Sequence, residues 1–152
     1  MVGIVIQGPT TFIKKVVDFY SGEAIQDKAK VVYSTWEDSN KEDLEYIENS
    51  PIDLVLSPLP EFSGHLNVNY QLKSTYEGIK FLESKGVSTI IKVRSDIIWA
   101  GVEELFDYFR NKRISFLNVN NRAKHELRKW EDYYLDYLHT HQDFPSDHVI
   151  AG

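Results

Sequence analysis

The chain has 152 residues, of which 42% are hydrophobic and 26% charged, and its formal net charge is -6. This length and composition predict a single soluble globular domain over residues 1–152, and the acidic balance without a basic run excludes sequence-independent nucleic-acid binding, which needs a positive face. No apolar run approaches about 18 residues, and no basic segment followed by an apolar one opens the chain, so we expect neither a transmembrane segment nor a signal peptide.

Cysteine is absent from the chain. Disulfides and thiolate metal sites are therefore excluded, and any bound metal ion must be held by oxygen or imidazole ligands. A chain without cysteine fits a reducing compartment, so we expect a cytoplasmic location.

A short β-branched run, residues 2–6, predicts the first strand, and a turn rich in Gly and Pro follows it. Thr10 or Thr11 is expected to cap the next helix, whose apolar residues fall at helical spacing. A strand, a glycine turn and a helix N-terminus suit an anion or nucleotide, because free backbone N–H groups point into the loop; a plain strand-to-helix turn is the alternative. The candidate binding residues of this turn are Gln7, Gly8 and Pro9.

Two further strands are expected at residues 30–36 and 52–56, with a short helix at residues 41–47 between them. Glu37 and Asp38 follow the second strand and make an acidic tip beside the tip of the first. β runs separated by helices predict parallel βαβ units with right-handed crossovers.

Residues 67–82 have helical periodicity, and Asn67 or Asn69 is expected to cap this helix. Its expected buried stripe comprises Val68, Leu72, Thr75, Ile79 and Leu82. A polar row one position earlier on the same rhythm comprises Asn67, Gln71, Ser74 and Gly78. Such a row suits a neutral, hydrogen-bonding ligand such as a sugar, ribose or base, although a solvated flank is the alternative. Gly78 favours the binding interpretation, because a glycine inside a helix costs about 1 kcal/mol relative to alanine.

The run that starts at Thr89 is too short and too β-branched for a helix, and it ends at an Arg-Ser-Asp tip. Its nearly continuous apolar character predicts a central strand covered on both faces. Ligands of open α/β sheets bind at the carboxyl ends of the strands, so Asp96 stands where a ligand or metal ion would be held. An aspartate that only caps the turn after the strand is the alternative.

The last third is expected to contain a helix at residues 102–112, a strand at residues 113–119 and a long helix at residues 122–141. An aromatic stripe on the long helix suits a buried core, with a sugar-stacking surface as the alternative, and an exposed aromatic face there would favour a homodimer. Three His and two Asp lie within residues 139–148, a composition that suits a divalent ion but has no fixed metal-site spacing.

Five segments carry a resemblance to a known family: Ile-Gln-Gly-Pro-Thr at 6–10, Ser-Thr-Trp-Glu at 34–37, Asn-Val-Asn-Tyr-Gln at 67–71, Lys-Val-Arg-Ser-Asp at 92–96 and Ser-Asp-His at 146–148. Their order resembles that of the WavE family of bacterial lipopolysaccharide-synthesis proteins, related broadly to glycosyltransferases of the A-type fold (GT-A). The second and fourth segments are the most specific. The resemblance implies an α/β fold: a mostly parallel, Rossmann-like sheet of the GT-A type with helices on both faces.

The function implied by this resemblance is transfer of a hexosyl group from a UDP- or GDP-linked sugar to a glycan or lipopolysaccharide-type acceptor, assisted by Mn²⁺ or Mg²⁺. Asp96 matches the last Asp of the Asp-x-Asp metal motif of such enzymes, and Glu37 or Asp38 would lie near the nucleoside. The resemblance also implies a nucleotide-sugar site with Gln7 and Gly8 at the tip of the first strand. Together with the residues of the turn, the polar row and the Arg-Ser-Asp tip, the candidate donor-binding residues are Gln7, Gly8, Pro9, Glu37, Asp38, Asn67, Gln71, Ser74, Arg94, Ser95 and Asp96.

The chain departs from the family pattern in two respects. Arg94 replaces the first Asp of the metal motif, and its planar fork suits phosphate oxygens directly. Asp96 would then hold the metal ion with His148 as a second ligand, and Asp147 is the candidate general base for the acceptor hydroxyl. The chain is also shorter than these enzymes, so a non-catalytic nucleotide- or sugar-binding module, or a fragment of a larger glycosyltransferase, is the alternative. An α/β domain without any nucleotide site is a third interpretation.

Overall fold

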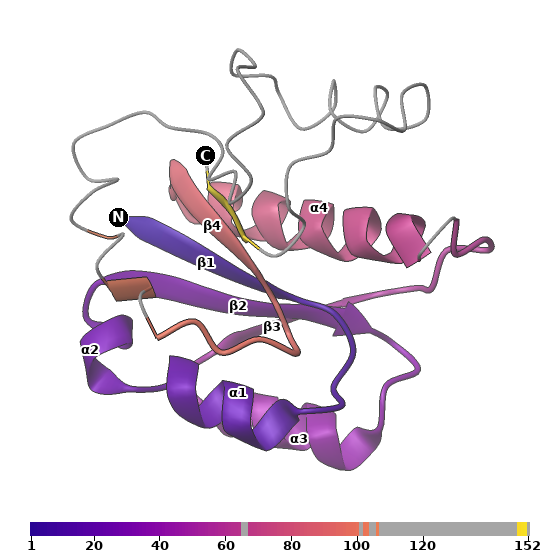
Figure 1. The fold of residues 1–152 in the computed structure, drawn as a ribbon, viewed down its shortest axis with the longest axis horizontal. Coiled ribbons are helices and arrows are strands. Elements are labelled where there is room, and N and C mark those ends of the chain that lie inside the picture. Colours follow the sequence, from indigo (N-terminus) through magenta and orange to yellow (C-terminus); the bar gives the residue numbers. More distant parts are fainter. Residues whose placement is uncertain (65–66, 101, 104–105, 107–148, 152) are drawn as a thin grey trace.

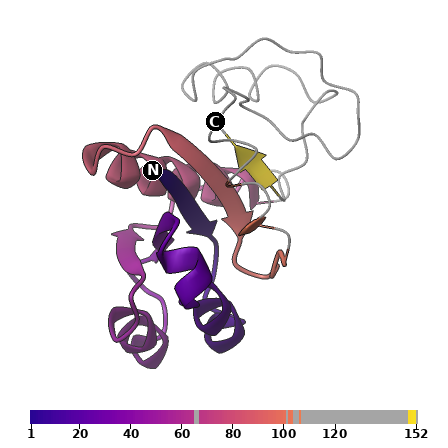
Figure 2. The same cartoon turned by 90° about the vertical axis from the view of Figure 1, so that its left-hand side faces the viewer.

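Five strands form one sheet in the computed structural model, which describes residues 1–64, 67–100, 102–103, 106 and 149–151. The strands are β1 (Val2–Gln7), β2 (Ala29–Trp36), β3 (Asp53–Ser57), β4 (Thr89–Arg94) and β5 (Val149–Ala151). Their order across the sheet is β3-β2-β1-β4-β5. Strands β1 to β4 are parallel to one another, whereas β5 runs antiparallel alongside β4 (Figures 1 and 2). The predicted mostly parallel α/β sheet is therefore confirmed.

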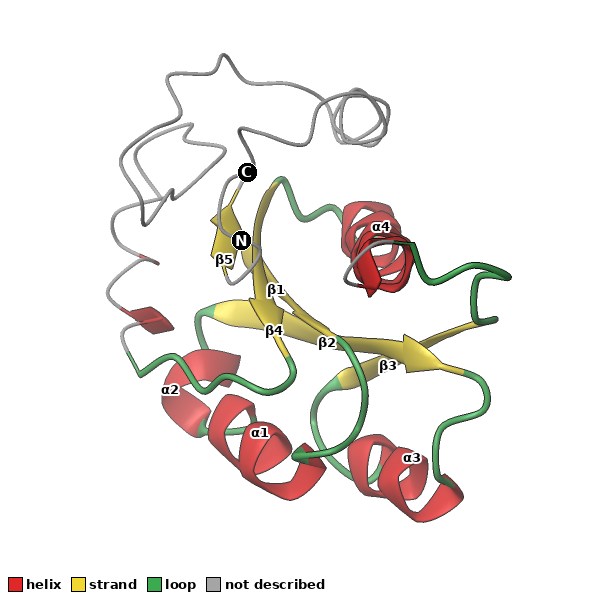
Figure 3. Cartoon of the chain, turned by 45° about the vertical axis from the view of Figure 1, so that its right-hand side comes forward, coloured by secondary structure: helices red, strands yellow, loops and turns green. Residues whose placement is uncertain are grey.

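Helices cover both faces of this sheet. They are α1 (Ile13–Tyr20), α2 (Glu23–Gln26), α3 (Lys41–Glu48) and α4 (Val68–Ser84). Figure 3 shows α1, α2 and α3 below the sheet and α4 alone above it. Because α4 crosses from β3 over β2 and β1 to reach β4, the crossover that follows β3 changes the face of the sheet.

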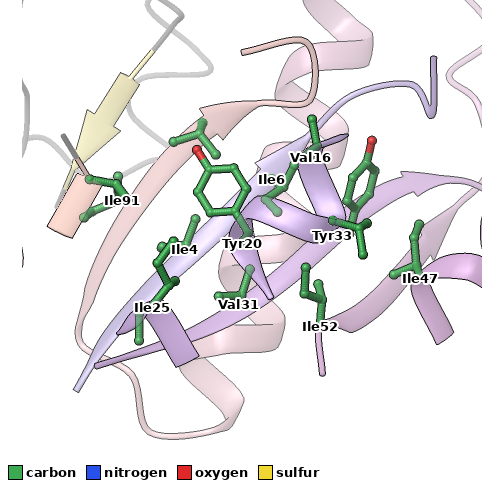
Figure 4. Packing of buried hydrophobic residues seen from close by; sticks show 14 of the residues in the cluster. Ile4, Ile6, Val16, Tyr20, Ile25, Val31, Tyr33, Ile47, Ile52 and Ile91 are labelled. Atoms are coloured by element: carbon green, nitrogen blue, oxygen red, sulfur yellow. The ribbon is translucent and has the colours of Figure 1, made fainter. Parts of the chain in front are cut away.

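The strand sequences are apolar on both sides because both faces of the sheet are covered. Strand alternation sends Ile4 and Ile6 into a large cluster under α1 and α2, and sends Val5 into a second cluster under α4. Figure 4 shows the large cluster, in which the rings of Tyr20 and Tyr33 are fully buried among aliphatic side chains. Val102 and Phe106 complete this cluster.

Gly78 lets α4 lie close to the sheet. A Cβ atom there would stand 2.6 Å from Val5 Cγ1, which is closer than side chains pack, and 3.2 Å from Ser34 Cβ, which is a tight contact. Gly78 and Ser74 are both buried, so half of the polar row expected along this helix faces the sheet instead of solvent. Close helix–sheet packing therefore explains why a glycine stands inside this helix. Gly78 gives no support to the prediction that α4 binds a ligand.

The predicted helix caps are wrong in their hydrogen bonds. Helix α1 begins after Phe12 without a side-chain cap, and Thr10 Oγ1 instead donates to Asp43 Oδ2 at 2.6 Å. Asn67 is the N-cap residue of α4, but it has a left-handed backbone (φ 61°) and its side chain makes no capping bond. Asn40 does cap α3, accepting from the Glu42 amide at 2.8 Å. A long-range partner thus took the hydroxyl that local rules assigned to α1.

Several predictions fall outside the described residues. Of the helix expected at residues 102–112, residues 102, 103 and 106 are described, and all three are helical. The strand at residues 113–119, the long helix at residues 122–141 and the homodimer inferred from it lie outside. No helix in the described part of the chain is long and apolar enough to cross a lipid bilayer.

Gly78→Ala is expected to lower the free energy of unfolding by about 1–3 kcal/mol, because overpacking against Val5 outweighs the roughly 1 kcal/mol gain in helix propensity. Urea denaturation followed by circular dichroism measures the change. Glu83→Ala, at an exposed position of the same helix, is the matched control and should change stability little. A stabilised Gly78→Ala protein would contradict the close packing of α4 on β1.

Alkaline pH should unfold this core. Burial raises the pKa of Tyr20 from 10.0 to about 12, and burial also raises the pKa of Tyr33, with a smaller contribution from Asp43. Because the folded-state pKa values lie above the unfolded value, the stabilisation is complete below about pH 10 and is lost as pH rises towards 12 and beyond, by at most about 1.4 kcal/mol per pH unit for each tyrosine. Urea titrations at pH 9, 10 and 11 measure the loss, and Tyr20→Phe should make it less steep.

Candidate functional site

The strand order reverses direction at β1. The chain passes from β1 outwards to β2 and β3, then returns to place β4 on the other side of β1, with α1 and α4 on opposite faces. The carboxyl edge between β1 and β4 is therefore a topological switch point, where open α/β sheets bind their ligands. Gln7, the last residue of β1, is paired with Arg94, the last residue of β4. The turns after these strands meet at that point.

Hydrogen bonds join the two turns. The Ser95 amide donates to the Gln7 carbonyl at 2.8 Å, and Ser95 Oγ donates to the Pro9 carbonyl at 2.8 Å. The Pro9 carbonyl also accepts a hydrogen bond from Tyr33 Oη at 2.9 Å, so a buried side chain of β2 holds the same carbonyl oxygen. Each bond contributes about 0.5–1.5 kcal/mol, and together they fix the path of the β1 turn.

Gly8 is the residue that allows this contact. Its φ of +133° is a backbone conformation that only glycine adopts readily, and a Cβ atom there would stand 2.5 Å from Ser95 Oγ. The Gly8 amide also donates to the Ser34 carbonyl at 3.3 Å. The glycine of the predicted turn is thus required by the approach of Ser95.

Arg94 and Asp96 form a two-point ion pair at the edge. Arg94 Nε donates to Asp96 Oδ1 at 2.9 Å and Nη2 donates to Oδ2 at 2.7 Å, while the two side chains are 32% and 38% exposed. A turn closed by the Ile97 amide on the Arg94 carbonyl, at 3.2 Å, sets the carboxylate beside the guanidinium. The carboxylate predicted to hold a metal ion therefore has a cation against both of its oxygens.

A second row of polar side chains, distinct from the one predicted along α4, crosses the strands of the sheet on the face that α4 covers. Strand alternation and register put Arg94, Gln7 and Ser34 side by side on neighbouring strands, with Lys92 two residues earlier on β4, opposite Val5. Gln7 and Lys92 are only 5% and 3% exposed, and the Ser34 hydroxyl is fully buried with no hydrogen-bond partner among the described residues. The apolar cluster under α4 thus gives way to polar groups towards the carboxyl edge.

The acidic tip of β2 lies next to β1, as expected. Glu37 and Asp38 are exposed just after Trp36, and the Glu37 amide donates to the Ser57 carbonyl at 3.0 Å. Trp36 also packs against Tyr70 of α4, with ring centroids 5.6 Å apart. Strand β1 lies between β2 and β4, so the acidic tip and the Arg94–Asp96 pair follow strands on opposite sides of β1.

The predicted residues of α4 divide into three environments. Asn67 is exposed at the start of the helix, and Gln71 is half-buried one turn later. Ser74 is fully buried, and its hydroxyl donates to the Tyr70 carbonyl at 2.8 Å. The structure thus brings together the β1 turn and the β4 turn, leaves Glu37 and Asp38 exposed at the end of β2 and Asn67 exposed at the start of α4, and turns Ser74 into the helix–sheet contact.

The fit of a divalent ion depends on Asp96. No group of three or more His, Asp or Glu side chains that would suit a metal ion occurs within the described ranges. A single carboxylate fits an ion such as Mg²⁺ or Mn²⁺ that takes its other ligands from water and substrate phosphates. Asp147 and His148, predicted as general base and second ligand, lie outside the described residues; they directly precede β5, whose Val149 pairs with Val93.

Two residues of this edge were missed by sequence reasoning. Tyr33 supports the Pro9 carbonyl, and Thr10 ties the β1 turn to α3 through Asp43. Strand alternation in β2 was a usable signal for Tyr33, because it places this side chain on the α1 face beside Ile6. No local signal marks the bond between Thr10 and Asp43.

No protein-family model, no curated protein and no solved structure matches this chain. Its function is therefore inferred from its residues and their geometry.

Gly8→Ala is expected to destabilise the fold by about 1–3 kcal/mol, because it combines backbone strain with overlap on Ser95. Gly86→Ala is the matched control: Gly86 also has a positive φ, +79°, but a Cβ atom there would meet nothing within 4 Å. Thermal melts of both variants measure the difference. An equal loss in the two would mean that the contact between Gly8 and Ser95 contributes nothing beyond backbone strain.

Proposed function

We propose that this chain binds a nucleoside-diphosphate sugar at the carboxyl edge between β1 and β4 and is a glycosyltransferase that passes the sugar to a glycan acceptor. The observation that carries the proposal is the switch point itself, where the β1 turn and the Arg-Ser-Asp tip of β4 are hydrogen-bonded together. The resemblance to the WavE family supports the same donor class.

The side chains around this edge suit the parts of such a donor. The Arg94 guanidinium has the geometry to bind two phosphate oxygens. Glu37 and Asp38, exposed at the end of β2, suit ribose hydroxyls, as acidic residues do after the second strand of dinucleotide-binding sheets. The half-buried Gln71 supplies an amide for neutral hydroxyl or base groups, and the buried Gln7 supports the edge from beneath.

A divalent ion bound with the diphosphate would neutralise the charge that the leaving nucleoside diphosphate develops. In this chain Asp96 is the described carboxylate that would hold such an ion, and His148 is the predicted second ligand. Asp147 is the proposed general base that takes the proton of the acceptor hydroxyl.

A non-catalytic nucleotide- or sugar-binding module is the second candidate. It is favoured by the metal motif, which retains one carboxylate and has that carboxylate paired with Arg94. The two candidates differ in turnover and share the binding site, so hydrolysis or transfer of the sugar from a radiolabelled donor separates them.

Calorimetric titration of the purified chain with UDP and with GDP, each with and without Mn²⁺, tests the site. We expect micromolar binding of one nucleotide that depends on Mn²⁺, and loss of this dependence in Asp96→Ala with a melting temperature within a few degrees of wild type. Glu48→Ala, an exposed carboxylate at the end of α3, is the control. Absence of binding for both nucleotides would remove the enzyme proposal for this chain by itself.

Arg94→Lys is expected to weaken UDP or GDP binding more than binding of the corresponding nucleoside. The planar guanidinium can donate two parallel hydrogen bonds to phosphate oxygens, and the ammonium group of lysine cannot reproduce this two-point contact. The ratio of nucleoside to nucleotide affinity, measured by the same calorimetry, reports this difference. An equal loss for both ligands would place Arg94 away from the diphosphate.

A further inference from the structure

We propose that Arg94 and Asp96 exchange partners when ligand binds: the guanidinium moves from the carboxylate to the diphosphate, and the carboxylate binds a divalent ion in place of the guanidinium. This inference rests on the proposed function, because it assigns the regulation of the same site. Each half of the ion pair thereby restrains the other until both ligands are present.

The pair is built so that it can open. It joins two residues of one turn, and both side chains are about one-third exposed. Ion pairs with this exposure contribute little to stability, so breaking one is within reach of an ordinary ligand. The backbone beneath it is held independently, because Ser95 is bonded to Gln7 and Pro9 through its amide and hydroxyl. Opening the pair therefore leaves the edge of the sheet in place.

Both members of the pair have a chemically better partner in a metal–diphosphate complex. A diphosphate offers the guanidinium paired anionic oxygens in the same two-point geometry that Asp96 offers now, with more negative charge. A divalent ion is a stronger partner for a carboxylate than a guanidinium is, since Mg²⁺ and Mn²⁺ prefer oxygen ligands.

The exchange makes the two ligands cooperative. A diphosphate alone must displace Asp96 from Arg94, and a divalent ion alone must displace Arg94 from Asp96. When both bind, one displacement serves both, so each ligand raises the affinity for the other by the same factor. Part of this coupling also comes from direct contact of metal and phosphate, so single variants are needed to isolate the exchange.

Inorganic pyrophosphate and Mn²⁺, each used alone, isolate the two halves. Asp96→Asn keeps the shape of the side chain but removes its charge, and it should raise metal-free pyrophosphate affinity by about three- to fivefold, in keeping with an exposed ion pair. Arg94→Gln should raise the affinity for Mn²⁺ alone by a similar factor, measured by the paramagnetic resonance signal of free Mn²⁺. Each variant thus improves binding of one ligand although it removes a predicted contact of the complete complex.

The double variant Arg94→Gln/Asp96→Asn separates exchange from simple charge effects. If the gain passes through Arg94, Asp96→Asn should not raise pyrophosphate affinity in the Arg94→Gln background. Glu48→Gln removes one charge from the exposed end of α3, outside the proposed site, and should leave metal-free pyrophosphate affinity within twofold of wild type. Circular dichroism melts show whether all variants are folded.

Two results would overturn the exchange. One is a metal-free pyrophosphate affinity that Asp96→Asn leaves unchanged; the other is a gain of equal size in the wild-type and Arg94→Gln backgrounds. Both results are compatible with Mn²⁺-dependent binding of UDP or GDP by the wild-type chain, so the exchange can fail while the proposed function stands. Failure of the wild-type chain to bind either nucleotide with Mn²⁺ would instead remove the proposed function, and the exchange with it.

Discussion

The hydrogen bond from the Ser95 amide to the Gln7 carbonyl extends the pairing of β1 and β4 one residue beyond the end of β4. Everything at the carboxyl edge depends on this bond. It brings the β1 turn under the Ser95 hydroxyl, requires glycine at position 8, and presents Arg94 and Asp96 together at the switch point. Because the bond is between backbone atoms, the edge keeps its shape when the charged side chains above it change partners.

A second constraint acts from the other side of the sheet. Helix α4 packs so closely that position 78 has no room for a side chain, and this contact buries Ser34 below it. The buried members of the polar row on the sheet, Gln7, Lys92 and Ser34, are therefore enclosed on the α4 face, whereas Arg94 and Asp96 remain partly open to solvent. A rigid, enclosed base with an exchangeable ion pair at its rim suits a site that must hold a highly charged ligand and then release it.

Much of the fold was predictable from local pattern. The β-branched runs gave four of the five strands to within one or two residues, because strands buried on both faces need continuous apolar sequence. Helical spacing gave the buried residues of α1, since Ile13, Val16, Val17 and Tyr20 all face the sheet. The predicted caps of α1 and α4 failed for a physical reason: a hydroxyl or amide near a helix start has several possible partners, and Thr10 found Asp43, which is 33 residues away.

The sequence by itself determined that the chain builds parallel βαβ units and that an Arg-Ser-Asp tip ends a central strand, because periodicity and residue type act locally. Only the tertiary structure decided what those residues touch. It paired Arg94 with Asp96, brought Ser95 to Gly8, and turned Ser74 and Gly78 into the helix–sheet contact. Such contacts depend on strand order and register, which bring together residues nearly ninety positions apart, and no local propensity encodes them.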